Sequence, residues 1–241
     1  MVGWICRREQ TKKAGGTSRE LGHRGEKLMG RELSWYWAQQ AERAIKALHE
    51  RGMEASFQAE PDAACEYILS RIGPGEIVGF GGSVTLVELG VLEALRRMDV
   101  ILLDRAKKNI TPAEKHELEE RASKADVFLS GINALTVDGR LVFLDCYGNR
   151  VASILHGPAR VLLVAGANKI EPTLERALWR VKEVAAPMNA HRLNRGTPCA
   201  VTGVCQDCRH EARVCNYTVI IEHAPRPGRF EVVLVGASLG L

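Results

Sequence analysis

The chain has 241 residues, of which 46% are hydrophobic and 26% are charged, and its formal net charge is +4. These proportions are typical of a folded globular protein with a substantial core, and they exclude the disordered and fibrous classes. No apolar run approaches the roughly 20 residues of a membrane helix or the apolar stretch of a signal peptide, so we expect a cytoplasmic protein with no membrane partner.

The positive charge is concentrated in residues 1–30, which hold seven basic and three acidic side chains and so carry 7 − 3 = +4, the whole of the formal charge. Residues 31–241 are therefore neutral overall, which predicts no nucleic-acid partner. Residues 1–30 also lack an apolar period, which predicts a disordered basic tail or a mis-assigned start that precedes the true one at Met29. We expect residues 31–241 to form a single domain.

The first regular pattern is a helix over residues 32–51, whose apolar residues recur at three- and four-residue steps up to Gly52. Strands and helices then alternate along the chain. We expect strands at 53–58, 76–80, 100–103, 127–130 and 159–166, helices at 61–72, 86–97, 112–123 and 173–184, and a hairpin around 138–145.

This alternation predicts an α/β fold with a Rossmann-like, largely parallel sheet and helices on both faces. The end of the chain differs, because a cysteine-rich loop at 196–216 precedes two strands near 217–222 and 229–236. We place these two C-terminal strands at the edge of the sheet.

The segment GFGGSVTLVELG, residues 79–90, follows one predicted strand and opens a helix. Gly81 and Gly82 allow the backbone to approach a ligand closely, while the hydroxyls of Ser83 and Thr85 and the helix N–H groups can bind an anion. The segment therefore predicts a phosphate or carboxylate cradle. The alternative is an ordinary strand-to-helix turn capped by Ser83.

Two more polar segments follow predicted strands, at residues 131–150 and 166–172. Their candidate ligand-binding residues are Asn133, Asn149, Arg150 and Asn168. Because parallel strands end at the same edge of a sheet, the three loops are expected to form one site for a small anionic molecule. Each segment taken alone is typical of an ordinary turn.

The charged side chains in and beside these loops are the candidates for chemistry. Glu88, Asp138 and Asp145 are candidate general acids or bases, and Lys169 is suited to neutralise an anionic substrate. Spacing alone does not select among the three carboxylates.

Four of the seven cysteines, Cys199, Cys205, Cys208 and Cys215, lie within 17 residues. Thiols in the cytosol are normally reduced, so this density favours ligation of zinc or an iron–sulfur cluster over a disulfide framework. The spacing C-x5-C-x2-C-x6-C matches neither paired zinc knuckles nor the plant-type iron–sulfur pattern. Redox-active cysteines and structural thiols are the alternatives.

Several motifs together resemble the LUD-domain family, the lactate utilisation proteins, over about residues 29–241: GFGGSVTLVELG, ADVFLSGINALTVDGRLVFLDCYGNRVA, GPARVLLVAGANKI and PCAVTGVCQDC. The resemblance implies the fold of ribose-5-phosphate isomerases and CoA transferases, with the loop at Gly79–Thr85 similar to their phosphate loop. It also implies that Asp138 and Asn149 meet a bound sugar. Asp138, Glu88 and Lys169 are thus the candidate catalytic residues.

Three functions follow from this resemblance. The first is an accessory or redox component of lactate or 2-hydroxyacid oxidation, partnered by iron–sulfur oxidoreductase subunits. The second is an isomerase or transferase for a small phosphorylated or CoA-linked substrate. The third is a non-catalytic ligand-binding regulator. Assembly into a homo-oligomer stays open in each case.

Overall fold

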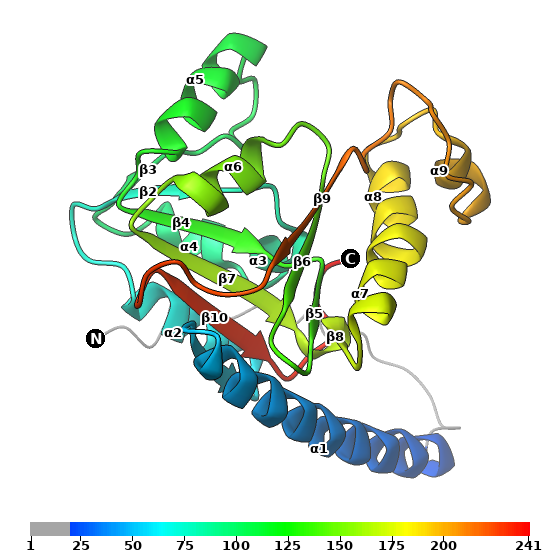
Figure 1. Cartoon of the computed structure of the whole chain (residues 1–241). Coiled ribbons are helices and arrows are strands. Elements are labelled where there is room, and N and C mark those ends of the chain that lie inside the picture. Colours follow the sequence, from blue (N-terminus) through cyan, green and yellow to red (C-terminus); the bar gives the residue numbers. More distant parts are fainter. Residues whose placement is uncertain (1–19) are drawn as a thin grey trace.

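A computed structural model describes residues 20–241 of the chain, and their side chains from residue 30 onward. Its centre is a sheet of six strands that all run parallel (Figure 1). In spatial order these are β1 (Glu54–Gln58), β10 (Phe230–Val235), β7 (Arg160–Gly166), β4 (Val127–Gly131), β2 (Ile77–Phe80) and β3 (Ile101–Leu102). The predicted Rossmann-like α/β fold is therefore confirmed.

Both faces of this sheet are covered. One face packs against α2 (Pro61–Ser70), α3 (Val84–Glu88) and α4 (Val91–Leu95). The other packs against α1 (Glu20–Glu50), α5 (Pro112–Ala122) and α6 (Asn149–His156). Because water reaches neither face, the middle strands are continuous apolar runs, and every residue of β4 and β10 is buried.

A second, four-stranded sheet lies beside α6 on the same side as α1. Its order is β8 (Ile170–Glu171), β5 (Ala134–Thr136), β6 (Leu141–Asp145) and β9 (Tyr217–Ile221). Leu135, Leu141 and Phe143 face the main core, whereas Ala134 and Val142 alternate to the other side. There they meet α7 (Leu174–Arg180), a π-helical turn (Val181–Ala185) and α8 (Ala186–Arg192).

The structure corrects the predicted place of the last two strands. β9 is at the edge of the second sheet, but β10 lies inside the main sheet between β1 and β7. Order along the chain does not fix order in space. The signal for a central position was the unbroken apolar run of β10, since an edge strand keeps one side in water.

Other differences concern where helices begin and end. The predicted helix at 32–51 begins at Glu20, and residues 1–19, most of the predicted tail, lie outside the described residues. The predicted helix at 86–97 is divided at Gly90, which adopts a φ of 73°. The prediction missed five short elements: α6, α8, β8, α9 (Pro198–Thr202) and a 3₁₀ turn (Ala167–Lys169). In the part of the chain that the structure describes, no helix is long and apolar enough to cross a membrane.

Candidate functional site

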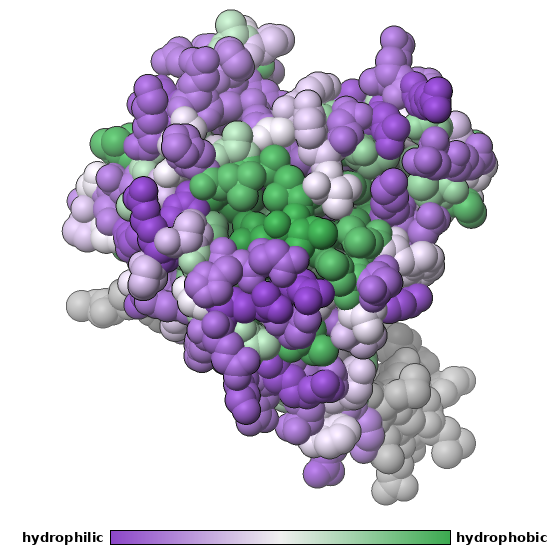
Figure 2. Space-filling view, viewed as in Figure 1, coloured by the Kyte–Doolittle hydropathy of each residue, from purple (hydrophilic) through white to green (hydrophobic). Residues whose placement is uncertain are grey.

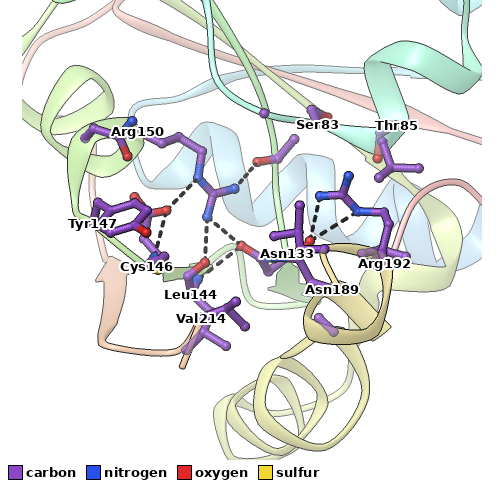
Figure 3. A pocket seen from close by; sticks show the side chains of 18 of the residues that line it. Ser83, Thr85, Asn133, Leu144, Cys146, Tyr147, Arg150, Asn189, Arg192 and Val214 are labelled. Carbon is purple, nitrogen blue, oxygen red and sulfur yellow. Dashed lines mark hydrogen bonds and ion pairs between the residues drawn. The ribbon is translucent and has the colours of Figure 1, made fainter. Parts of the chain in front are cut away.

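A pocket of about 580 Å³ lies at the carboxyl ends of the strands. It lies where the chain reverses direction across the sheet, since β3 is placed on one side of β2 and β4 on the other. Such a reversal leaves a crevice in which parallel α/β proteins bind ligands. The loops after β2, β4, β6 and β7 form its floor, and α5 and α8 form its sides. We refer to this as the strand-end pocket (Figure 3).

The glycine segment after β2 contributes Gly82, Ser83 and Thr85 to the pocket wall. Ser83 is the N-cap of α3, where its Oγ accepts a hydrogen bond from the Leu86 N–H at 3.3 Å. A Cβ on Gly131 would lie 2.6 Å from the Ser83 Oγ, so β4 approaches this cap as only glycine allows. The segment is thus both a capped turn and part of the pocket wall.

Arg150 joins the pocket loops after β4 and β6 and is 9% exposed. Its guanidinium donates to Gly131 O at 3.3 Å, Asn133 Oδ1 at 2.9 Å and Leu144 O at 2.8 Å (Figure 3). Asp145 Oδ1 lies 3.7 Å from its Nε. Burial lowers the pKa of Arg150, and the Asp145 carboxylate opposes this shift. Most donors of Arg150 are therefore used to hold the loops after β4 and β6 together.

Lys169 ends the 3₁₀ turn after β7 and is 3% exposed. Its Nζ donates to Thr85 Oγ1 at 2.9 Å, and among the described side chains no carboxylate lies within ion-pair distance. Burial, together with the positive charges of Arg180 and Arg150, lowers the pKa of Lys169 to about 7, although Glu88 acts in the opposite direction. At neutral pH this amine is therefore partly unprotonated.

Basic side chains surround the mouth of the pocket. The lining contains six Lys or Arg residues and two acidic side chains, and the basic ones are Arg105, Lys115, Arg150, Lys169, Arg192 and Arg195. The difference is 6 − 2 = +4 when Lys169 is protonated and 5 − 2 = +3 when it is not. Glu119 neutralises Arg105 at 2.6 Å. Lined by one sign of charge, a low-dielectric cleft attracts ligands of the opposite sign. The pocket is therefore suited to an anion.

The two sides of the pocket belong to separate hydrophilic lobes. In the space-filling view, α5 and the α8–α9 region stand on either side of a notch, and apolar residues gather at the centre of the same face (Figure 2). Arg192 is exposed on its lobe, where its Nη2 donates to Asn189 Oδ1 at 2.7 Å. The sequence interpretation did not assign this lobe or α5 to the site, because charged residues on helices usually face the solvent.

The predicted site residues divide into two groups. Seven line the strand-end pocket, namely Gly82, Ser83, Thr85, Asn133, Asn149, Arg150 and Lys169. Gly81 lies behind the wall, where a Cβ would be 2.8 Å from Arg150 Cγ. Glu88 and Asn168 hold the C-terminal segment, because Glu88 accepts from Gly240 N at 2.6 Å and Asn168 from Leu239 N at 3.1 Å.

Asp138 lies outside the pocket. It occupies the turn between β5 and β6, at the opposite end of the hairpin from Asn133 and Asp145. Its side chain is 50% exposed and pairs with Arg51 at 3.7 Å and Arg140 at 3.5 Å. The carboxylate is thus held by surface arginines, and we leave it out of the candidate site.

The four clustered cysteines do not converge. All are free thiols, and among the described residues no three His, Cys, Asp or Glu side chains gather into a group that could hold a metal ion. Cys215 Sγ accepts from Arg213 at 3.4 Å, whereas Cys199 lies 3.5 Å from the Thr197 hydroxyl. The residues present therefore do not fit the predicted zinc or iron–sulfur site.

Another cysteine, Cys146, lines the pocket without having been predicted. Its Sγ donates to Arg213 O at 3.3 Å, and burial raises the pKa of the thiol. A thiol with a raised pKa is a poor nucleophile, so we assign Cys146 a packing role in the pocket wall rather than a reactive one.

One comparison with known proteins identifies a family. A family model described as the LUD domain matches residues 41–235. No curated protein matches. Among solved structures, a DUF162 family protein from Deinococcus radiodurans is 14% identical, with a TM-score of 0.48 over 83% of this chain and 98% of that one.

Two other structures match over shorter regions. Ribose 5 phosphate isomerase A from Neisseria gonorrhoeae is 13% identical, with a TM-score of 0.32 over 47% of this chain and 54% of that one. The eIF2B beta protein from Chaetomium thermophilum is 16% identical, with a TM-score of 0.34 over 48% of this chain and 44% of that one.

Proposed function

We propose, from the premise that this chain belongs to the LUD-domain family, that its strand-end pocket binds a small organic anion and acts on it as an isomerase or transferase. The observation that carries the proposal is the excess of cationic over carboxylate side chains in the pocket wall. Phosphorylated and CoA-linked compounds are the substrate classes that suit such a wall, because phosphate groups are recognised by Arg, Lys and backbone N–H groups.

Lys169 is the group that we assign to proton transfer. A general acid or base works best when its pKa is near the operating pH, and Lys169 has a pKa of about 7 at the inner wall of the pocket. Thr85 holds the amine in place through its hydroxyl. Glu88 tunes the amine electrostatically, and Asn168 supports the adjacent backbone.

Thermal unfolding with added anions tests the binding step. We expect inorganic phosphate, ribose 5-phosphate or CoA to raise the melting temperature by roughly 5–10 °C at a hundredfold excess over its Kd. Arg192→Gln should weaken binding about two- to fivefold, since one exposed charge contributes up to about 1 kcal/mol. Arg209→Gln, an exposed arginine outside the pocket lining, is the matched control.

A broad panel that leaves the melting temperature unchanged, with wild type and Arg192→Gln behaving alike, would contradict the proposal. Stabilisation without any turnover of the same compounds would instead favour a ligand-binding regulator.

A part in lactate or 2-hydroxyacid oxidation is the second candidate, and the family match is the observation that favours it. A 2-hydroxyacid is also a small organic anion, so its carboxylate suits the same cationic wall. We derive no electron-transfer step, because the cysteines do not form a metal site in the described residues. For this candidate function we also propose iron–sulfur oxidoreductase subunits as partners. Assembly into a homo-oligomer is a proposal that applies to either candidate function.

A further inference from the structure

We infer that Lys169 is a nucleophile that forms an imine with the carbonyl carbon of a small anionic aldehyde or ketone bound in the strand-end pocket. The inference rests on the proposed function, because it needs the pocket to bind an organic anion. It goes beyond that function by giving Lys169 a covalent intermediate in place of proton transfer, and by narrowing the substrate to a carbonyl compound.

The first support is the position of the amine. Lys169 lines the pocket but is 3% exposed, so its side chain borders the cavity and meets little other solvent. On the opposite side the backbone of Gly240 closes the space, since a Cβ there would lie 2.8 Å from the Nζ and 2.4 Å from Thr85 Oγ1. Gly240 has a φ of 66°, which favours glycine. The amine is thus packed against Gly240 and Thr85, two groups that fix its position in a side chain that lines the pocket.

The second support is the charge around the amine. An amine attacks a carbonyl only in its unprotonated form, and lysines reach that form near neutral pH when they are desolvated or lie beside another cation. Both conditions hold here, because Arg180 on α7 and Arg150 on α6 add positive charge and Lys169 is buried. The carboxylate of Glu88 on α3 acts in the opposite direction and favours the protonated amine, and it accepts a hydrogen bond from the Gly240 N–H.

The chemistry needs no further reactant. The Nζ lone pair forms a C–N bond to the carbonyl carbon, the carbonyl oxygen takes up a proton, and the nitrogen loses one. The same oxygen then takes up a second proton and leaves as water, while the nitrogen gives up its second proton, and a neutral C=N bond remains. Thr85 Oγ1, 2.9 Å from the Nζ, is placed to accept and return a proton, because a hydroxyl both donates and accepts. Hydrolysis reverses the sequence and frees Lys169.

The remaining pocket groups define the rest of the ligand. Its anionic group is expected at the cationic sides, where Lys115 and Arg192 line the mouth. Two kinds of compound combine a carbonyl with an anion of this size, 2-oxo carboxylates and aldose phosphates. They share the chemistry that Lys169 needs, and they differ in whether a carboxylate or a phosphate meets the cationic sides.

Reductive trapping tests the inference. Native protein is incubated with sodium cyanoborohydride and either pyruvate or ribose 5-phosphate, and lysine adducts are located by peptide mass spectrometry. We expect one reduced adduct on Lys169 with one of the two compounds, at least tenfold above any exposed lysine. Lys169→Met should lose this adduct, whereas Lys124→Arg, at an exposed position, should keep it.

Thr85→Val keeps the shape of its side chain and removes the hydroxyl, so it should slow trapping without abolishing binding. It also serves if Lys169→Met does not fold. Adducts spread over exposed lysines, with Lys169 unmodified, overturn the inference. Binding of either compound by thermal shift without an adduct overturns it too, but leaves the proposed function standing. Absence of both binding and adducts counts against both.

Discussion

The strand-end pocket and the cysteine-rich loop at 196–216 gather their polar groups in opposite ways. The pocket collects residues from Gly82 to Leu241, which are far apart in sequence, whereas the four cysteines of the loop lie within 17 residues and yet belong to no group of three potential metal ligands among the described residues. The difference shows that parallel-sheet topology assembles a site more reliably than closeness along the chain, because every strand delivers its next loop to the same edge.

The two regions also differ in how firmly they are held. In the pocket, Arg150 and Asn133 bond to backbone groups of separate loops, and Lys169 is buried beside Thr85. In the loop, Cys205 and Cys208 are half-buried, and the residues between and beside them are largely exposed. Substitutions in the pocket are therefore expected to change the free energy of unfolding far more than those in the loop.

Arg150→Met should have the largest effect. Its removal takes one donor from each of the carbonyls of Gly131 and Leu144 and the cationic partner from Asp145, although Ser130 Oγ still donates to Gly131 O. Stranded buried acceptors and charges of this kind cost about 3–5 kcal/mol in free energy of unfolding. Urea unfolding followed by circular dichroism measures the change.

Arg209→Met in the cysteine-rich loop is the matched control, because it removes the same group from an exposed position. It should change the free energy of unfolding by less than about 0.5 kcal/mol. Equal effects of the two substitutions would remove the contrast between the regions.

Gly81→Ala is expected to come next. Its Cβ would lie 2.8 Å from Arg150 Cγ and 2.9 Å from Cδ, and the bonded guanidinium prevents this side chain from moving away. Overpacking of this type costs about 1–3 kcal/mol. Gly82→Ala is the control one residue away, since nothing lies within 4 Å of the added carbon. Thermal unfolding of both variants should separate them, and a similar loss of stability in each would contradict the argument.

The main sheet was largely predictable from the sequence. Short apolar runs such as those of β4 and β7 are typical of buried strands. The loops at the carboxyl ends of these strands were therefore predicted to form a site, and they make up about half of the pocket wall. The interior position of β10 was not predictable in the same way, because it depends on which two strands β10 pairs with, and these are β1 and β7. Helix α6 was not predicted, because the residues before it are typical of a turn. Its N-terminus is held by Asp145, whose carboxylate accepts a hydrogen bond from Val151 N at 3.2 Å across that turn.

The other half of the site comes from α5 and α8. Lys115 and Arg192 look like ordinary solvated charges in the sequence, and only packing of these helices beside the strand ends makes them part of the wall. Asp138 shows the opposite error, because a residue in a polar segment was assigned to the site although the hairpin carries it away. Spacing along a strand is informative, but the direction of a hairpin is not encoded in any single residue.

The stability of the protein should depend on the ionisation of Lys169. Its pKa in the folded protein is about 7, below the ordinary 10.5 of the free side chain. Between these two values the unfolded chain holds a proton that the folded chain has lost, so the free energy of unfolding rises with pH in this window. The expected slope is on the order of 1 kcal/mol per pH unit.

The measurement compares wild type with Lys169→Met by urea unfolding between pH 7 and pH 10, and takes the difference in unfolding free energy at each pH. That difference should grow with pH in favour of wild type. Lys124→Met should give a difference that does not change with pH, because Lys124 is exposed. A flat difference for Lys169→Met as well would mean that its amine keeps an ordinary pKa.

Substitution of the loop thiols should have the smallest effect. Cys205→Ser and Cys208→Ser, singly or together, are expected to change the free energy of unfolding by about 0.5 kcal/mol or less, and to leave anion affinity unchanged. The physical reason is that both thiols are half-buried in a loop where no three potential metal ligands meet, within the part of the chain that the structure describes.

This small effect is informative because the alternative is large. Structural zinc contributes about 10–16 kcal/mol to small domains that depend on it, so the loss of even one thiolate ligand would lower stability well beyond the error of a urea titration. A double serine variant whose free energy of unfolding falls by several kcal/mol would therefore show that the four cysteines do come together when a metal is present. The contrast between loop and pocket would then depend on metal rather than on topology.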